Sequence, residues 1–229
     1  MATQFRIVAL ISGGGTTLQN LIDRISAGRL AAEIVGVVSS RASVAGVVRA
    51  QRAGIPVTVV EARRTGEGEK GGTGEANTES VSDSPVPPFL RSFSDDVWAA
   101  VRNHKPDLVV FAGWLHLLPI PADFRHRVLN IHPALLPAFG GKGMYGRRVH
   151  EAVLAYGAKV SGCTVHFADE TYDTGPIIVQ KCVPVKEGDD PDTLAARVFQ
   201  AECDAYPEAI ELIAAGRVTV QGRRVIISG

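Results

Sequence analysis

Asn130 and His132 are the residues of this sequence best suited to acyl-transfer chemistry. They lie in the segment Asn130-Ile131-His132-Pro133, which we expect at the end of a buried strand. Because side chains alternate along a strand, the carboxamide and the imidazole share one face, and Ile131 points to the other. Such a pair can polarise a carbonyl group and move a proton. Neither serine nor cysteine lies near them, so we expect the nucleophile to come from a substrate.

Asp173 is the expected partner of His132. It lies in a short polar loop between two β-rich segments, and a carboxylate beside an imidazole orients the ring and raises its pKa. Taken singly, each residue is more often structural, as a hydrogen-bonded strand-end histidine or a turn aspartate. Four further histidines have weaker claims and no metal-ligand spacing, so no metal is expected: His104, His126, His150 and His166.

A glycine-rich turn near the start of the chain could hold a phosphate group. Gly13, Gly14 and Gly15 follow a buried strand and precede an amphipathic helix. Unpaired backbone N–H groups and the positive end of the helix dipole meet at such a turn. Thr16 and Thr17 add hydroxyl donors. The turn therefore predicts a site for a phosphorylated substrate.

The same turn leaves two alternatives open. The dinucleotide fingerprint requires a third glycine where Leu18 stands and an acidic residue after the second strand, where this chain has Ser39-Ser40-Arg41. NAD is therefore disfavoured, but Arg41 could hold the 2′-phosphate of NADP, as in an NADP-dependent reductase. A tight turn without any ligand is the other alternative.

The elements that must position these residues alternate between strands and helices. Apolar runs predict strands at residues 5–11, 33–39 and 56–60 and at residues 107–112, with helical spacing between them. Near-continuous apolar strands are typical of a parallel sheet covered by helices on both faces. Residues 63–88 are rich in Gly, Glu, Ser, Thr and Pro, and we interpret them as a flexible insertion within the fold.

The second half of the chain predicts a change in strand direction. We expect a short helix at residues 122–127, a strand at residues 128–132 and a longer helix at residues 147–156. Residues 160–167 and 176–185 should form an antiparallel pair. A long helix to about residue 215 and a hairpin at residues 218–227 follow. The predicted fold class is α/β, with a doubly wound, Rossmann-like N-terminal half and a mostly parallel sheet extended by antiparallel strands in the C-terminal half.

Composition narrows the function classes. Apolar residues make up 45% of the 229 residues, and no apolar run approaches the ~20 residues of a membrane span. Lys plus Arg and Asp plus Glu both total 24, which gives no net field toward nucleic acid. Cys163, Cys182 and Cys203 show no paired spacing, so neither disulfides nor zinc is expected. Without a targeting segment we expect a cytoplasmic protein.

In combination these motifs resemble the phosphoribosylglycinamide formyltransferase family, the folate-dependent enzymes of purine synthesis. The resemblance runs nearly from end to end. Its carrying stretches are ISGGGTTLQ at residues 11–19, PDLVVFAGW at 106–114, LNIHPALLP at 129–137, GCTVHF at 162–167 and DTGPII at 173–178. It implies a single formyltransferase domain over residues 1–229, with a nucleotide-phosphate-binding half, residues 1–112, and a folate-binding and catalytic half, residues 113–229.

The resemblance also implies substrates and residue roles. The formyl donor is 10-formyltetrahydrofolate, the acceptor is the amine of glycinamide ribonucleotide, and no metal, nucleic acid or membrane takes part, although a homodimer is possible. Asn130, His132 and Asp173 fall on the catalytic positions. Residues implied to bind glycinamide ribonucleotide are Gly13, Gly14, Gly15, Thr16, Thr17 and Glu202. Residues implied to bind folate are Arg91, Trp114, Leu115, His116, Leu117, Leu118, Asn130, Asp169 and Glu170.

Some positions depart from the family pattern. The family usually has Asn at the position of Thr17, often Arg at that of His116, and His at that of Cys203. Methionyl-tRNA formyltransferases share the Asn-x-His-Pro block but add a C-terminal domain of about one hundred residues, and formyltetrahydrofolate deformylases add an N-terminal domain, so we expect both to fit less well. A folate-binding protein without turnover is a further alternative.

Overall fold

The computed structural model describes residues 4–62 and 88–229, and the side chains of residues 88–92 lie outside that description. The insertion predicted at residues 63–88 therefore lies outside the described residues, except for its last residue, which begins a helix. Among the described residues, no helix has both the length and the apolar character needed to cross a membrane.

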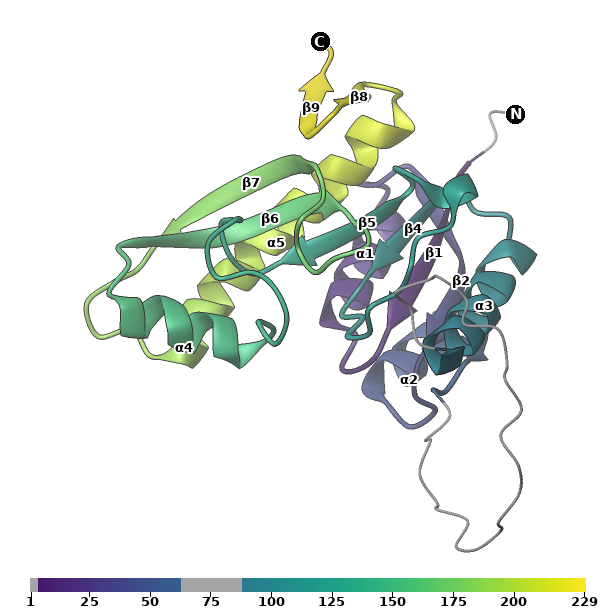
Figure 1. Cartoon of the computed structure of the whole chain (residues 1–229), viewed down its shortest axis with the longest axis horizontal. Helices are drawn as coiled ribbons and strands as arrows, with labels where there is room; N and C mark the ends of the chain where they lie inside the picture. Colours follow the sequence, from purple (N-terminus) through teal and green to yellow (C-terminus); the bar gives the residue numbers. More distant parts are fainter. Residues whose placement is uncertain (1–3, 63–87) are drawn as a thin grey trace, which may run out of the picture.

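A seven-stranded sheet forms the centre of the molecule (Figure 1). Its strand order is β3-β2-β1-β4-β5-β6-β7, and the first five strands are parallel. Strand β6 runs antiparallel to β5, and β7 runs antiparallel to β6. The strands are β1 (Phe5–Ile11), β2 (Ala32–Ser39), β3 (Val57–Val59), β4 (Leu108–Phe111), β5 (Val128–His132), β6 (Val160–Phe167) and β7 (Ile177–Pro184). The predicted mixed sheet is confirmed.

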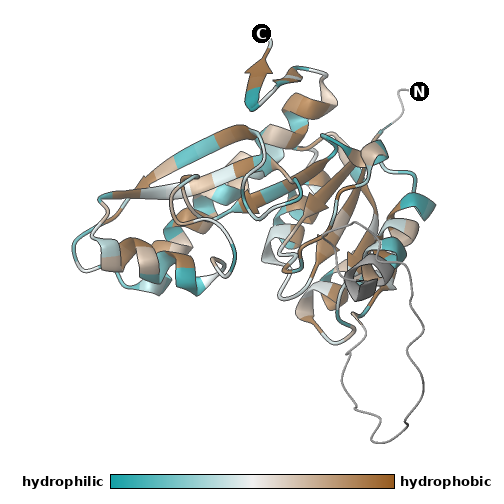
Figure 2. Cartoon of the chain, in the orientation of Figure 1, coloured by the Kyte–Doolittle hydropathy of each residue, from teal (hydrophilic) through white to brown (hydrophobic). Residues whose placement is uncertain are grey.

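Helices cover both faces of this sheet. They are α1 (Thr16–Ser26), α2 (Ala45–Arg52), α3 (Pro88–Asn103), α4 (Arg147–Tyr156) and α5 (Pro191–Ala214). Alternate residues of β1 divide between two buried clusters: Ile7 and Ile11 pack with α1, α2 and α5, whereas Val8 and Leu10 pack with α3. This alternation is what a strand buried on both faces requires. In Figure 2 the strands of the parallel part of the sheet are mostly apolar, whereas the helices carry both apolar and hydrophilic residues.

Helix α5 supports the carboxyl ends of the two central strands. Its start is fixed by a capping box, in which Asp190 and Thr193 exchange hydrogen bonds. Further along, the fully buried Tyr206 directs its hydroxyl to the carbonyl oxygens of Phe111 and Leu129, 3.0 Å from each. Those carbonyls belong to β4 and β5, immediately before the segments that carry the expected site residues. One phenol thus links the helix to both strand ends.

One prediction about local structure is wrong, and another is confirmed. The short helix expected at residues 122–127 is a single 3₁₀ turn, Ala122–Phe124, because the chain reverses at His126 with a positive φ of 56°. The C-terminal hairpin, β8 (Val218–Gln221) and β9 (Arg224–Ile227), exists as predicted but forms a sheet of its own. Neither difference changes the elements around β5.

Candidate active site

A cavity of about 750 Å³ opens at the carboxyl ends of β4 and β5. This is the edge of a parallel α/β sheet at which ligands usually bind. Most of the expected site residues line it: Thr16, Thr17, Trp114, Leu115, His116, Leu117, Leu118, Asn130, His132, Asp169, Asp173 and Glu202. Gly13, Gly14, Gly15 and Glu170 are described but do not line it, and the side chain of Arg91, in α3, is outside the described part. The structure therefore brings most of the expected residues into one space.

Asp173 joins the two expected catalytic residues of β5. Its Oδ2 lies 3.4 Å from Nδ1 of His132, and its Oδ1 accepts a hydrogen bond from Nδ2 of Asn130 at 3.2 Å. Oδ2 also accepts from the backbone N–H of Gly141 at 2.9 Å. The amide, the imidazole and the carboxylate therefore form one cluster, in the arrangement that the sequence could only propose.

Backbone geometry holds Asp173 in that place. Asp173 adopts a left-handed φ of 59°, which Asp tolerates better than most residues. Gly140 packs against it: a Cβ at Gly140 would lie 2.5 Å from Cδ2 of Leu136 and 3.3 Å from Cβ of Asp173. Gly175 has a similar role, since a Cβ there would lie 1.8 Å from the carbonyl oxygen of Phe167. Two glycines thus allow the loop to approach β5 and β6 closely.

The carboxyl of Asp173 favours its ionised form. Burial by itself would raise its pKa, but the surrounding groups, the N–H of Gly141 and the ring of His132 among them, outweigh that effect and hold the pKa below its usual value. For His132 the balance is opposite. Burial lowers its pKa more than Asp173 and the carbonyl of Phe139 raise it. In the ligand-free protein we therefore expect an Asp173 carboxylate beside a mainly neutral His132 at neutral pH.

His166 is a member of the cluster that sequence reasoning missed. It is 1% exposed, and its Nε2 lies 3.2 Å from Nδ2 of Asn130 and 3.7 Å from Oδ1 of Asp173. The reason is the antiparallel register of β5 and β6, which pairs Asn130 with His166 and His132 with Thr164. Directly paired residues project from the same face of a sheet. Alternation within residues 160–167 was the sequence signal for His166. It identifies His166 as a neighbour of Asn130 only when the pairing register of β5 and β6 is known.

The glycine turn leads directly to one wall of the cavity. Gly15 caps the start of α1 with a left-handed φ of 69°, and a Cβ there would lie 2.6 Å from the Cα of Gly46 in α2. Around Gly13 and Gly14, by contrast, a Cβ would meet nothing within 4 Å. The first N–H groups of α1 therefore start from a turn whose backbone is open to a ligand, as anion-binding helix starts require.

The segment from Trp114 to Leu118 forms an apolar wall of the cavity. Trp114 is buried and stacks on Phe93, with ring centroids 5.9 Å apart, and tilts against His116 at 5.4 Å. Burial, with a smaller contribution from Arg41, lowers the pKa of His116. The backbone N–H of Leu115 donates to Oγ of Ser12 at 3.1 Å, which ties this wall to the residue before the glycine turn. A flat aromatic ligand suits such a wall.

Another part of the lining comes from α5 and from the segment before α4. Glu202 of α5 lines the cavity, and burial raises its pKa to about 7. Lys142 and Arg148 contribute basic groups, which suit anionic substrates. His150 of α4, expected only to sit on a helix, is buried in the same wall, and its Nδ1 has no hydrogen-bond partner among the described residues. Sequence reasoning identified Glu202 in this wall but not His150.

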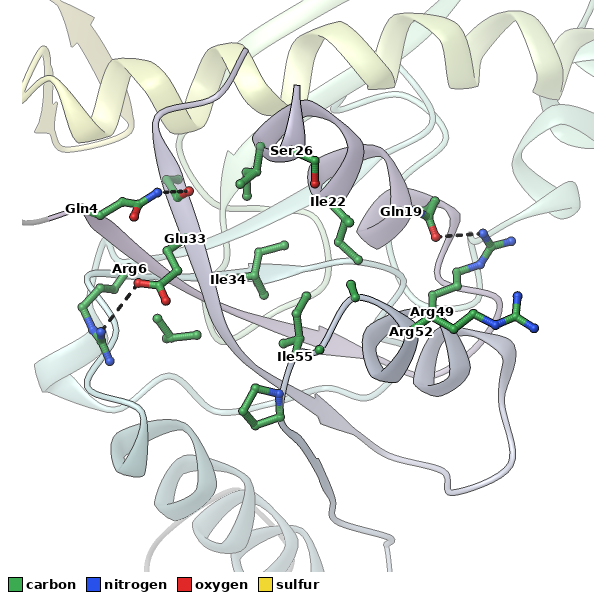
Figure 3. Close-up of a pocket in the computed structure, with 16 residues that line it drawn as sticks. Gln4, Arg6, Gln19, Ile22, Ser26, Glu33, Ile34, Arg49, Arg52 and Ile55 are labelled. Carbon is green, nitrogen blue, oxygen red and sulfur yellow. Dashed lines mark hydrogen bonds and ion pairs between the residues drawn. The ribbon is translucent and has the colours of Figure 1, made fainter. Parts of the chain in front are cut away.

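A second cavity, of about 770 Å³, lies away from this cluster (Figure 3). It is lined from the starts of β1 and β2 and from α1 and α2. Two of its basic side chains have partners within the protein, because Arg49 donates to Gln19 and to the carbonyl of Gly14, and Arg6 faces Glu33. None of the expected catalytic residues lines it. Nowhere in residues 4–62 and 88–229 do three or more His, Cys, Asp or Glu side chains gather as metal ligands.

Comparison with known proteins gives a consistent result. The family model described as "Formyl transferase" matches residues 5–210. The crystal structure of glycinamide ribonucleotide transformylase 1 from Symbiobacterium toebii is similar, with a TM-score of 0.82 and 36% identity, covering 100% of this chain and 96% of that one. Phosphoribosylglycinamide formyltransferase from Brucella melitensis is 37% identical with a TM-score of 0.74, covering 96% and 100%.

Curated sequences of longer proteins also match. The chloroplastic phosphoribosylglycinamide formyltransferase of Vigna unguiculata is 35% identical over 215 residues, which is 93% of this chain and 62% of the relative. The trifunctional purine biosynthetic protein adenosine-3 of Gallus gallus is 40% identical over 217 residues, but the match spans 19% of its length. This chain therefore spans about three fifths of the first relative and about one fifth of the second.

Proposed function

This chain belongs to the formyl transferase family, and within it to the phosphoribosylglycinamide formyltransferases, and we propose that it transfers the formyl group of 10-formyltetrahydrofolate to the amine of glycinamide ribonucleotide in de novo purine biosynthesis. The observation that carries the proposal is the cluster around the Asp173 carboxylate, where Asn130 and His132 meet. The cluster lies in one cavity with Thr16 and Thr17, which begin α1, and with Trp114. This combination suits a phosphorylated amine and a folate.

The two substrates would enter from different halves of the chain. Residues 1–112 supply the glycine turn, whose N–H groups would hold the phosphate of glycinamide ribonucleotide, with Thr16 and Thr17 beside it. Residues 113–229 supply the folate wall and the catalytic cluster. Glu202 would contact the ribose and amine portion of the nucleotide. The apolar wall around Trp114 would hold the pterin ring, whose polar edge main-chain groups can read.

The reaction needs no covalent enzyme intermediate. The neutral amine of the nucleotide attacks the formyl carbon, so a new C–N bond forms and the formyl oxygen gains negative charge. The bond from the formyl carbon to N10 of the folate then breaks, and N10 takes a proton as it leaves. The proton lost by the amine is the proton that N10 gains. The step is therefore balanced without any other reactant.

His132 can move that proton once the contact between its Nε2 and the carbonyl oxygen of Phe139, 2.9 Å in the ligand-free structure, is replaced by a contact to the substrates. Because burial keeps its ring mainly neutral, it can accept the amine proton as the attack proceeds. The imidazolium so formed is stabilised by Asp173 at 3.4 Å and can donate to the oxyanion and then to the leaving nitrogen. A positioned acid or base contributes roughly two to four powers of ten, and an oxyanion donor about 3–4 kcal/mol. These magnitudes make His132 the residue on which turnover depends most.

Asn130 lines the same cavity, and it would share in stabilising the oxyanion if the formyl group binds beside it. In the ligand-free structure Nδ2 of Asn130 already lies 3.2 Å from Asp173 and 3.2 Å from His166. An amide nitrogen carries two hydrogens, so both have an acceptor within reach. Donation to the oxyanion therefore requires one of these bonds to be replaced when the substrates bind.

The test is incubation of the purified chain with glycinamide ribonucleotide and 10-formyltetrahydrofolate. We expect formylated nucleotide and tetrahydrofolate in equal amounts. Formate in place of formylated nucleotide would indicate hydrolysis, and tight folate binding without product would indicate a binding protein. Either result would overturn the proposal. A titration with NADP tests the reductase alternative, and we expect no binding at the glycine turn.

A further inference from the structure

His166 and Asp173 together determine how the amide of Asn130 is turned. Oδ2 of the Asp173 carboxylate accepts the N–H of Gly141, and Oδ1 of the same group is likewise an acceptor. The atom of Asn130 at 3.2 Å from that oxygen must therefore be Nδ2, because a carbonyl oxygen there would face a carboxylate oxygen without a proton between them. The two ends of an amide have nearly the same shape, so the positions of its nitrogen and oxygen are assigned here from which atom can donate a hydrogen bond.

The same nitrogen fixes the tautomer of His166. Nδ2 of Asn130 lies 3.2 Å from Nε2 of His166, and since Nδ2 can only donate, Nε2 must accept. Nδ1 of His166 lies 2.8 Å from the carbonyl oxygen of Phe167, which can only accept, so Nδ1 must carry the hydrogen. Both contacts require the same neutral form of the ring. One proton assignment thus satisfies all the hydrogen bonds from the Phe167 carbonyl to the Asp173 carboxylate.

This arrangement leaves the other end of the amide to the cavity. Both hydrogens of Nδ2 are directed to Asp173 and His166, and among the hydrogen bonds of the described residues none reaches Oδ1 of Asn130. Asn130 lines the cavity, so its remaining polar group is an acceptor. An acceptor beside the reacting carbon suits the N–H of an attacking amine, because holding a hydrogen of the amine directs its lone pair at the carbon.

We propose that His166 is a positioning residue: by accepting a hydrogen bond from Asn130 at Nε2, it turns Oδ1 of Asn130 toward the amine of the acceptor substrate. The proposal rests on the proposed function, since it concerns the amine nucleophile of the same reaction. It assigns Asn130 a task in orienting the nucleophile and leaves the oxyanion mainly to His132. His166 itself touches no substrate in this scheme.

The variants His166→Gln and His166→Asn form a matched pair. A glutamine amide reaches the position of Nε2 and can present its oxygen as the acceptor for Asn130. An asparagine amide reaches only the position of Nδ1, so it keeps a partner for Phe167 but loses the acceptor. We expect His166→Gln to retain kcat/KM for the nucleotide within about threefold and His166→Asn to lose at least about tenfold. Equal loss in both variants would overturn the proposal.

A double-mutant cycle separates positioning from a structural effect. In an Asn130→Ala background, His166→Asn should lower single-turnover formyl transfer by no more than about twofold, because His166 acts through an amide that is absent. A loss in that background as large as in the wild type would overturn the proposal. Circular dichroism and thermal unfolding confirm that the compared variants are folded.

A measurement on the unsubstituted protein covers the case in which a variant does not fold. The ¹⁵N chemical shifts of His166 at pH 7.5 report which ring nitrogen carries the hydrogen. We expect a protonated Nδ1 and an unprotonated Nε2, and the opposite tautomer or an imidazolium would overturn the proposal. If the wild-type protein forms no formylated nucleotide, the proposed function fails, whereas the tautomer result is independent of activity.

Discussion

Nδ1 of His132 lies 3.4 Å from Oδ2 of Asp173, and their side chains are only 4% and 9% exposed. A charge pair formed there acts in a medium of lower dielectric than water, so removing the carboxylate has a larger effect than at the surface. Asp173→Asn keeps the shape of the side chain and removes the charge. We expect kcat/KM to fall by roughly two to four powers of ten, as for loss of an acid–base partner.

In the same variant, the pH dependence of kcat/KM should shift in a direction that can be measured. Since His132 must be neutral to accept the amine proton, kcat/KM should fall as pH decreases through its pKa, which burial places below 6.5. Asp173 raises that pKa, so Asp173→Asn should move the acid limb to still lower pH. A limb that moves upward would contradict the account. Asp123→Asn, which removes a carboxylate at the exposed Arg102 pair, is the control.

The glycine turn makes two opposite predictions for neighbouring residues. A Cβ at Gly15 meets Gly46 at 2.6 Å and requires a left-handed residue, so Gly15→Ala should destabilise the fold by about 1–3 kcal/mol. A Cβ at Gly13 meets nothing within 4 Å, so Gly13→Ala should leave the unfolding free energy within about 0.5 kcal/mol. If the turn holds the phosphate, Gly13→Ala should instead raise KM for the nucleotide. Urea unfolding and steady-state kinetics together test this contrast.

Much of the scaffold around these residues was predictable, because its signals are local. The glycine break after β1, the apolar runs of β2 and β4 and the aspartate before α5 each identify an element through its own sequence. The expected helix at residues 122–127 was too long, because no local sequence pattern indicates the positive φ of His126 that follows the 3₁₀ turn Ala122–Phe124. Local patterns thus gave the elements but not every boundary.

The composition of the site depended on information that is not local. Asn130 and His132 lie two residues apart, and strand alternation predicts that they share one face. His166 joins them through the β5–β6 register, and His150 through the packing of α4, which no single segment specifies. The approach of Asp173 depends on Gly140, far away in the chain, having no side chain. Contacts of this kind require the three-dimensional structure.

Tyr206 offers a test of how the strand ends are held. Its fully buried hydroxyl lies 3.0 Å from the carbonyl oxygens of Phe111 and Leu129. Tyr206→Phe leaves both carbonyls without that donor, so we expect a loss of about 1–3 kcal/mol in unfolding free energy. Thermal or urea unfolding measures it. An unchanged stability would show that the phenol does not contribute to holding β4 and β5.

Glu202 predicts a pH-dependent change in stability. Burial raises its pKa from 4.5 to about 7, so the protonated carboxyl is favoured in the folded protein. The associated stabilisation is present at low pH and is lost as pH rises through about 7. Glu202→Gln has no carboxyl group to ionise. Its unfolding free energy relative to that of the wild type should therefore increase from pH 5.5 to pH 8. Urea unfolding at both pH values tests the sign, and a difference that decreases with pH would contradict it.

The central claim is that His132 moves the proton during formyl transfer to the nucleotide amine. The most direct measurement is single-turnover formation of formylated glycinamide ribonucleotide by the wild type and by His132→Ala at saturating substrates, with nucleotide affinity measured by calorimetry. We predict a rate lower by roughly two to four powers of ten with an affinity changed less than about threefold. A folded His132→Ala variant with the wild-type rate would contradict the account.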